Sequence, residues 1–246
     1  MTLAADHARD TRLLARALDR AKPPPGPPFR CPYLAGRVAR QLTVLPRPLV
    51  AGTYHALMDL NFRRLGDVFY RPACADCDAC RMIRVPVREF RPSRAQRRCL
   101  RRNIDLAVEA AVPEPAADKH ALYRRYLAGR HDGTMDGSWP EYEHFLYSSP
   151  VESLEVTYRE RGRLVAAAIV DIEPEALSAV YCYYDPAERP RGLGSFNILW
   201  LLEESRRRGL SYLYLGYYVA EAPRMSYKAR FRPCEVLDPG LGWRRL

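Results

Sequence analysis

The chain has 246 residues, of which 48% are hydrophobic and 28% are charged, so its composition is that of a globular protein with a core of its own. Basic residues outnumber acidic ones by 39 to 29, and this formal charge of +10 favours a polyanionic partner such as nucleic acid or an anionic membrane surface. No run of about 18 apolar residues is present, which excludes a transmembrane helix, and acidic residues interrupt the region where a secretory signal would lie. We therefore expect a cytoplasmic protein whose seven cysteines are reduced thiols.

The first part of the chain divides into a tail and a mixed region. Residues 1–28 combine a short amphipathic helix over 11–20 with a proline-rich, extended stretch, and we expect a flexible N-terminal tail. Residues 29–112 are predicted to form an N-terminal domain with a helix over 50–63 and strands over 68–70, 82–87 and 104–112. A second helix begins at Ser93, where Gln96 three residues later completes a capping-box pattern. Prolines 113 and 115 mark the boundary with the next domain.

Residues 116–246 give a clearer pattern. Helices are predicted over 116–128 and 139–147, and strands over 152–159 and 163–172 are joined by a hairpin turn at Gly162. A strand over 177–184, a helix over 195–208 that ends at Gly209, and a strand over 211–219 follow. This order is that of the GNAT acyltransferases. It predicts an α+β, GNAT-like fold in which a mixed sheet is flanked by helices, preceded by the cysteine-containing N-terminal region.

A glycine-containing turn lies between the strand at 177–184 and the helix that follows. Gly192 and Gly194 allow backbone amides to approach a ligand at the positive end of the helix dipole, and Arg189 and Arg191 add charge. The pattern predicts a phosphate-binding turn. An ordinary helix entry without a ligand is the alternative.

The cysteines at 74, 77 and 80 are spaced so that their thiolates can converge on one metal or cluster. Cys31, in another loop-like stretch, is the candidate fourth ligand. Four thiolates suit structural zinc or an iron–sulfur cluster, and the spacing does not choose between them. Three reduced cysteines in a turn are the alternative, and Cys99, Cys182 and Cys234 are expected to be buried small hydrophobes.

An arginine-rich segment runs from residue 88 to residue 102. It holds seven arginines and one acid, Glu89, which is a local charge of 7 − 1 = +6. A phosphate backbone would neutralise this charge, whereas a solvated charged helix is the alternative. The arginines expected to contact nucleic acid are Arg91, Arg94, Arg97, Arg98 and Arg101, of which all but Arg97 share one helical stripe.

Several strings together resemble the arginyl/leucyl-tRNA–protein transferases, and in length and cysteine spacing their bacterial branch, the aspartate/glutamate leucyltransferases. The similarity runs from about Cys31 to Pro233. The strings are Phe62-Arg-Arg-Leu-Gly66, Phe69-Tyr-Arg-Pro72, Phe90-Arg-Pro-Ser-Arg-Ala-Gln-Arg-Arg98, Leu122-Tyr-Arg-Arg-Tyr-Leu127 with Arg130-His131, Ser178-Ala-Val-Tyr-Cys-Tyr-Tyr-Asp-Pro186 and Tyr227-Lys-Ala-Arg-Phe-Arg-Pro233.

The resemblance implies an enzyme of the N-degron pathway of protein degradation, with aminoacyl-tRNA as co-substrate and no organic cofactor. Its expected acceptors are proteins that begin with Asp or Glu, and its expected donor is leucyl-tRNA. Arginyl-tRNA as donor stays open from the sequence. Two further readings also stay open, namely an acetyl-CoA-dependent N-acetyltransferase that uses the same glycine turn, and a non-enzymatic RNA-binding module with a structural zinc.

Such a transfer needs little side-chain chemistry because the donor ester is already activated. Catalysis then depends on positioning the amine, with one base at most. Asp185 is the candidate for orienting or deprotonating the amine, with Tyr183 beside it as a second catalytic candidate. Tyr181 is expected on the same face of the strand, in the substrate pocket or in the core, and Lys228 and Arg230 are expected to read the acidic side chain of the acceptor.

Overall fold

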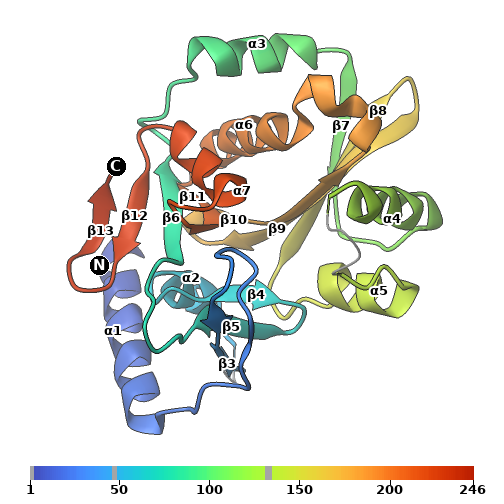
Figure 1. Cartoon of the computed structure of the whole chain (residues 1–246). Coiled ribbons are helices and arrows are strands. Elements are labelled where there is room, and N and C mark those ends of the chain that lie inside the picture. The colour runs from blue at the N-terminus through green and yellow to red at the C-terminus, as the bar shows by residue number, and fades with distance from the viewer. Residues whose placement is uncertain (1–2, 46–48, 131–134) are drawn as a thin grey trace.

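The computed structural model describes residues 3–45, 49–130 and 135–246; His131 of the family-like strings lies outside them. In this part of the chain an eight-stranded sheet has the order β13-β12-β6-β11-β10-β9-β8-β7 (Figure 1). Its neighbouring strands are antiparallel except for the parallel pair β10–β11. The strands are β6 (Arg81–Pro86), β7 (Leu106–Ala111), β8 (Ser153–Glu160), β9 (Arg163–Glu173), β10 (Ala176–Tyr184), β11 (Tyr212–Tyr218), β12 (Glu235–Asp238) and β13 (Gly242–Arg245).

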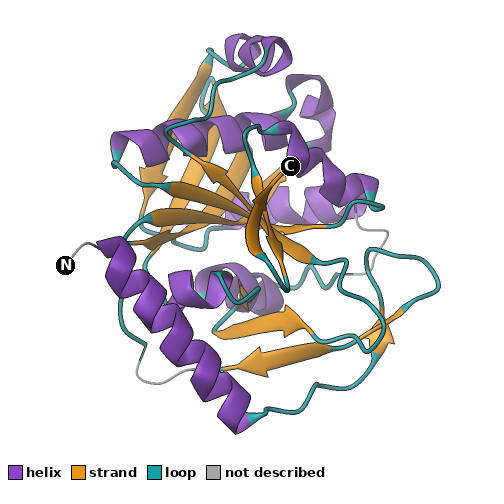
Figure 2. Ribbon diagram, turned by 90° about the vertical axis from the view of Figure 1, so that its left-hand side faces the viewer, coloured by secondary structure: helices purple, strands orange, loops and turns teal. Residues whose placement is uncertain are grey.

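Helices cover one face of the sheet, where α6 packs on the strands and α3 packs above α6 (Figures 1 and 2). The opposite face carries α4 and α5 together with an N-terminal layer made of α1, α2 and the small sheet β3-β5-β4. The core therefore lies on both sides of the large sheet. The bounds are α1 (Leu3–Ala21), α2 (Thr53–Met58), α3 (Arg94–Arg102), α4 (Ala117–Arg130), α5 (Trp139–Tyr147), α6 (Leu193–Arg207), β3 (Gln41–Val44), β4 (Arg63–Leu65) and β5 (Val68–Pro72).

Shorter elements complete the described chain. A two-stranded sheet pairs β1 with β2 near the first cysteine. The 3₁₀ helix η1 precedes α6, and α7 and the 3₁₀ helix η2 follow β11. Their bounds are β1 (Phe29–Arg30), β2 (Val38–Ala39), η1 (Pro186–Arg191), α7 (Pro223–Ser226) and η2 (Tyr227–Arg230).

Local sequence signals determine where three of these elements begin or end. Ser93 and Gln96 form the capping box at the start of α3, each side chain accepting a hydrogen bond from the other residue's backbone N–H. Arg161 and Gly162 both have positive φ, at 48° and 86°, as a tight hairpin between β8 and β9 requires. Gly209, with φ of 73°, ends α6. The predicted α+β, GNAT-like fold, with its mixed sheet flanked by helices, is confirmed.

The N-terminal region differs from the expected tail. Residues 3–21 form one helix, α1, and its His7 bonds to Asp59 at the end of α2, with 3.0 Å between His7 Nε2 and Asp59 Oδ2. The His7 ring also stacks on His55, with centroids 3.8 Å apart. The helix expected over 50–63 is shorter, because Asn61 takes a positive φ of 68° and the chain turns into β4.

The large sheet crosses the domain boundary that the sequence suggested near residue 112. Strands β6 and β7 come from residues 29–112, and the remaining six come from residues 116–246. β6 pairs with both β11 and β12, so it lies inside the sheet. The two regions therefore share one sheet in this structure, and their independence as domains stays a prediction.

Candidate active site

The parallel strands β10 and β11 separate after a short paired stretch. They pair from Ala176 with Tyr212 to Ser178 with Tyr214, and no further. Beyond these positions each strand keeps pairing with its other neighbour, and each has a register shift, after Ala179 in β10 and after Tyr214 in β11. Beyond Ser178 the facing edges of β10 and β11 therefore do not pair with each other, and their backbone N–H and C=O groups can bond to other parts of the protein.

The guanidinium of Arg63, from β4, fills this opening. Its Nη2 donates to the Val180 carbonyl at 2.9 Å, on the edge that β11 leaves unpaired. On the β11 side it lies against Gly216, where a Cβ atom would come within 2.7 Å of Arg63 Cζ. Gly216 also has a positive φ of 76°, so the close approach and the backbone conformation both require glycine.

A pocket of about 380 Å³ opens beside Arg63, where the small sheet, α4, α5 and β10 meet. Its walls are mostly aromatic and aliphatic, and they include Tyr123, Phe145 and Tyr181. Arg63 and the carboxylates of Asp136 and Glu141 supply charges of both signs. The pocket can therefore hold an apolar group and a zwitterionic group.

Tyr181 and Tyr183 share one face of β10, as the alternation predicts, but only Tyr181 reaches the pocket. Tyr183 is fully buried between β10 and α4, with its ring 5.5 Å from that of Tyr123. Burial, followed by the neighbouring Tyr142 hydroxyl, holds the pKa of Tyr183 well above its usual value. The direct catalytic contact expected of Tyr183 does not fit this burial, and its place is in the core.

Asp185 lies at the end of β10 and is not among the residues that line the pocket. Its Oδ1 accepts from the Ala187 backbone N–H at 3.0 Å, so Asp185 caps η1. Its Oδ2 lies 3.4 Å from Arg163 and 3.8 Å from Arg125. These partners describe a residue that shapes the turn, and a direct role with the amine stays a prediction.

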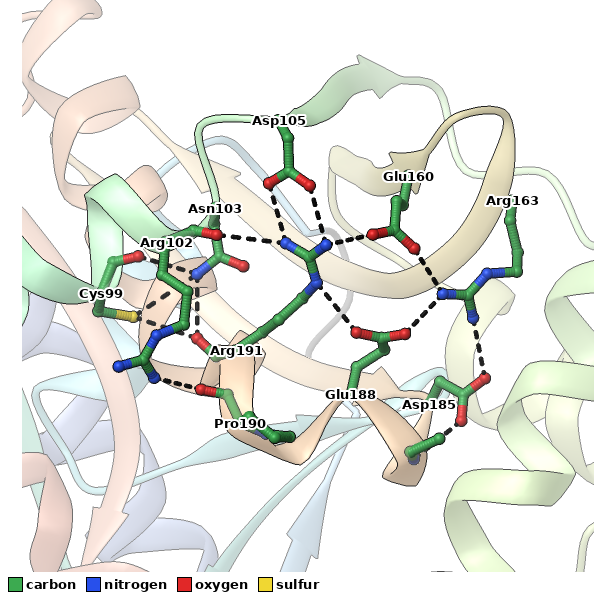
Figure 3. A network of polar contacts seen from close by, with 11 residues as sticks. Cys99, Arg102, Asn103, Asp105, Glu160, Arg163, Asp185, Glu188, Pro190 and Arg191 are labelled. Atoms are coloured by element: carbon green, nitrogen blue, oxygen red, sulfur yellow. Dashed lines mark hydrogen bonds and ion pairs between the residues drawn. The ribbon is translucent and has the colours of Figure 1, made fainter.

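The glycine turn contains a network centred on Arg191 (Figure 3). Its guanidinium pairs with both oxygens of Asp105, at 2.9 and 2.8 Å, with Glu188 at 2.9 Å and with Glu160. Three carboxylates thus neutralise the charge that was expected to meet phosphate. Arg189 differs, because it is exposed and forms no ion pair among the described residues.

Gly192 is the N-cap of α6, with φ of 68°, and a Cβ atom there would lie 3.7 Å from Cys99 Sγ. Gly194 lies in the first turn, where a Cβ atom would meet the Tyr184 ring at 3.6 Å. The positive φ requires glycine at position 192. At both positions a Cβ atom would meet its nearest neighbour at an ordinary van der Waals distance, so close approach does not require glycine at either. The predicted anion binding by this turn stays a prediction.

The two residues expected to read the acceptor lie apart from the pocket wall. Lys228 is 6% exposed, and its Nζ donates to the Tyr217 carbonyl at 2.6 Å. Burial, assisted by the charge of Arg63, holds the pKa of Lys228 well below its usual range. Arg230 is exposed at the end of η2. The pocket is lined instead by Arg63 and Arg64, of which Arg64 is paired with Asp171.

The cysteine loop lies beside Lys228 and the small sheet. Burial raises the pKa of Cys80 to about 12, and the thiols of Cys31, Cys77 and Cys74 add to the rise because they lie near it. The Leu34 N–H donates to Cys31 Sγ at 3.4 Å. Among the described residues, no three cysteine sulfurs come within 4.8 Å of one another. The four thiols thus share one region without the close geometry of a formed metal site.

The seven arginines from Arg88 to Arg102 are all exposed. Arg97 donates to the Pro92 carbonyl at 2.7 Å and Arg102 to the Pro190 carbonyl, while Arg91 donates to two nearby carbonyls. No acidic side chain in the described chain pairs with any of the seven, and Glu89 pairs with Arg245 instead. The charge of this segment is therefore available to a partner.

Sequence reasoning missed Arg63 as a site residue. The residue stands in the string Phe62-Arg-Arg-Leu-Gly66, which was used only to recognise a resemblance. The two adjacent arginines alternate across a strand, so one of them had to face away from the other. This alternation was the available signal, but both arginines line the pocket, and only the fold shows which one stays without an acidic partner. Arg64 pairs with Asp171, whereas Arg63 lies in the separation of β10 from β11.

Comparison with known proteins covers nearly the whole chain. The family description "Arginine-tRNA-protein transferase, N terminus" matches residues 29–98, and "Arginine-tRNA-protein transferase, C terminus" matches residues 118–238. The chain is 44% identical over 219 residues to the aspartate/glutamate leucyltransferase of Halorhodospira halophila, with 87% of this chain and 92% of the relative covered. The enzyme of the same name from Methylobacillus flagellatus is 43% identical over 220 residues, with 88% of each chain covered.

A solved structure supports the fold. The C-terminal domain of a putative lysylphosphatidylglycerol synthetase from Agrobacterium fabrum superposes with a TM-score of 0.51 at 16% identity, covering 78% of this chain and 62% of that one. At this identity the likeness concerns the fold alone. In the described part of the chain, no helix is long and apolar enough to cross a membrane.

Proposed function

The chain belongs to the arginyl/leucyl-tRNA–protein transferase family, and from this premise we propose that it transfers leucine from leucyl-tRNA to the N-terminus of proteins beginning with Asp or Glu. Such a transfer would act in the N-degron pathway of protein degradation, in the cytoplasm, where charged tRNA is found. The observation that carries the proposal is the mixed pocket at the separation of β10 and β11.

The reaction requires the acceptor amine to be neutral and close to the donor ester. An α-amino group has a pKa of about 7.7–8.0, so a part of it is unprotonated at physiological pH. Its nitrogen attacks the carbonyl carbon of the leucyl ester and the C–N bond forms. The C–O bond to the tRNA ribose then breaks, and the amine proton leaves with the tRNA hydroxyl oxygen. No protein nucleophile is needed, and binding both substrates in one pocket supplies the rate enhancement.

The apolar wall of the pocket suits the leucyl group. Tyr123, Phe145 and Tyr181 present rings, and Tyr181 lies 5.0 Å from Phe145 in an edge-to-face arrangement. An arginyl group would need an acid within reach, and Asp136 and Glu141 line the same pocket. The donor assay therefore compares both charged tRNAs.

We place the tRNA backbone on the exposed arginines of α3 and its flank, with Arg189 of the glycine turn as an additional contact. These side chains carry charge that no acidic group of the described chain neutralises. Phosphates supply that neutralisation and release counterions, so binding should weaken steeply with salt. Arg91, Arg94, Arg97, Arg98 and Arg101 are the residues proposed.

The four cysteines are proposed as ligands of a structural zinc ion or an iron–sulfur cluster. The donor set fits, because Cys31, Cys74, Cys77 and Cys80 lie in two neighbouring loops and the Leu34 N–H already donates to one sulfur. Bound metal would deprotonate the thiols and fix these loops beside the small sheet. Metal analysis of anaerobically purified protein should find stoichiometric zinc or iron, and a protein with four titratable thiols and no metal would contradict this assignment.

The experiment that tests the function uses purified protein and tRNA charged with labelled leucine or arginine. The acceptors are peptides that differ only in their first residue, which is Asp, Glu, Lys or Ala. We expect label from leucyl-tRNA on the Asp and Glu peptides alone. Label from arginyl-tRNA instead would reassign the donor, and no label from either tRNA, with acetyl-CoA then active, would replace the proposal with an N-acetyltransferase.

A further inference from the structure

We propose that the guanidinium of Arg63 binds the side-chain carboxylate of the acceptor's first residue and so sets the preference for Asp and Glu. This inference rests on the proposed function and names the specificity-determining residue of its pocket. Arg63 lines the pocket, and its Nη2 donates to the Val180 carbonyl. The remaining N–H groups of the fork can serve a carboxylate.

Within the described residues, no acidic partner neutralises the charge of Arg63. No acidic side chain of the described chain lies within ion-pair distance of Arg63, although Asp136 and Glu141 belong to the same pocket. The tyrosines near the guanidinium are Tyr33, Tyr54, Tyr70 and Tyr217, and the centroid of the Tyr217 ring lies 5.8 Å from Arg63 Cζ. A cation in a largely buried aromatic setting lacks the solvent that would otherwise stabilise it, so an incoming carboxylate gains more than it would at the surface.

The other cations near the pocket are already bonded within the protein. Arg64 donates to Asp171 from Nε at 2.9 Å and from Nη2 at 3.0 Å. Lys228 is buried against the Tyr217 carbonyl. Among the described residues that line the pocket, Arg63 is thus the cation with free capacity.

The position of Arg63 in the sheet also favours carboxylate binding. It lies between the separated strands β10 and β11, held by Val180 on one side and by the backbone of Gly216 on the other. A guanidinium fixed on both sides loses little freedom when it binds a carboxylate. The acids Asp136 and Glu141 offer a complementary environment for the α-ammonium group that an N-terminal Asp or Glu carries on the same residue.

The test compares peptides that begin with Asp and Asn, which have nearly the same shape and differ in charge. The readout is the ratio of kcat/KM for the Asp peptide to that for the Asn peptide, with leucyl-tRNA saturating. We expect wild-type enzyme to favour Asp by about 10- to 100-fold, as a charge-assisted hydrogen bond provides. Arg63→Gln should bring this ratio close to one, mainly through KM of the Asp peptide.

Arg71→Gln is the matched control. Arg71 lies on the neighbouring strand β5, 4.9 Å above the Phe62 ring, and donates to the Leu60 carbonyl, but it does not line the pocket. This variant should keep the wild-type ratio. Arg63→Lys, which retains the charge without the planar fork, should keep a preference for Asp with a raised KM.

A merely structural role of Arg63 would lower the rates with both peptides and leave their ratio unchanged. A wild-type ratio in Arg63→Gln would therefore overturn this inference while the transferase function stands. If the Gln variant does not fold, a KM for the Asp peptide in Arg63→Lys equal to that of wild type would overturn it. Wild-type enzyme that labels no acidic peptide would instead overturn the proposed function, and this inference with it.

Discussion

Arg64 and Asp171 form a two-pronged ion pair in which neither side chain is exposed to solvent, and this pair joins the small sheet to the large one. Arg64 Nε lies 2.9 Å from Asp171 Oδ2, and Arg64 Nη2 lies 3.0 Å from Oδ1. Ser153 also donates to Asp171, at 2.7 Å. Because Arg64 follows Arg63 in β4, the pair fixes the strand that presents Arg63 to the pocket.

Replacing Asp171 with Asn should therefore lower the free energy of unfolding by about 3–5 kcal/mol, since it leaves a buried guanidinium without its counter-charge. Urea denaturation measures this change. Asp78→Asn is the control, because Asp78 pairs with Arg81 at 2.8 Å but is 68% exposed, and the loss should stay below about 1 kcal/mol. Equal losses in the two variants would contradict the structural role given to the buried pair.

Alanine variants of Arg191 and Arg189 should have different effects, one on stability and the other on tRNA binding. Arg191→Ala leaves the carboxylates of Asp105, Glu160 and Glu188 facing one another without a cation, and we expect the free energy of unfolding to fall by about 1–2 kcal/mol. Arg189→Ala removes an exposed side chain and should leave stability unchanged while weakening tRNA binding. Thermal unfolding and tRNA titration of both variants would show this division, and an unstable Arg189→Ala protein would argue against it.

Reversing the charge of Arg94 and Arg98 to Glu should weaken tRNA binding and reduce its salt dependence. Each lost phosphate contact lowers the slope of log K against log salt by about 0.7–0.9, so two lost contacts lower it by about 1.4–1.8. The measurement is a tRNA titration at several salt concentrations.

The control for this pair reverses Arg12 and Arg16 on α1. These two residues have the same four-residue spacing and are also exposed, so their reversal alters the net charge equally. An equal loss of tRNA affinity in both double variants would assign the effect to overall charge rather than to α3.

Signals confined to one element predicted the fold well. The capping box of Ser93 and Gln96 and the positive-φ turn at Gly162 depend on a few neighbouring residues, and the structure has both. The alternation of β10 likewise placed Tyr181 and Tyr183 on one face. These features follow from local backbone geometry, which the sequence carries directly.

The site was harder to predict because its residues are selected by contacts between distant elements. Lys228 was expected to bind a carboxylate, but the packing of η2 against β11 buries it and gives its ammonium to a carbonyl. Arg191 was expected to meet phosphate, but β7 and β8 bring Asp105 and Glu160 to it. Charge in a sequence shows that a cation is present, and only the fold shows which acids reach it.

His55 and Glu173 should give opposite contributions to the pH dependence of stability. Burial, followed by the charge of His7, lowers the pKa of His55 to about 3. Between pH 6.5 and 3 the unfolded chain therefore binds a proton that the native protein does not, so acidification lowers the free energy of unfolding. Burial raises the pKa of Glu173 to about 7, so between pH 7 and 4.5 the native protein binds the extra proton and acidification raises the free energy of unfolding.

The two contributions oppose each other between pH 6.5 and 4.5, and single variants should separate them. Glu173→Gln removes the carboxyl titration, so its stability should fall by up to about 1.4 kcal/mol per pH unit as the pH drops from 6.5 to 5. His55→Gln, whose amide can still bond to the Tyr214 hydroxyl, should gain stability over the same range. Urea unfolding of both variants and wild type at pH 5, 6 and 7 measures the slopes. Three parallel curves would mean that neither buried group titrates with the shifted pKa, because each substitution would then remove no proton linkage.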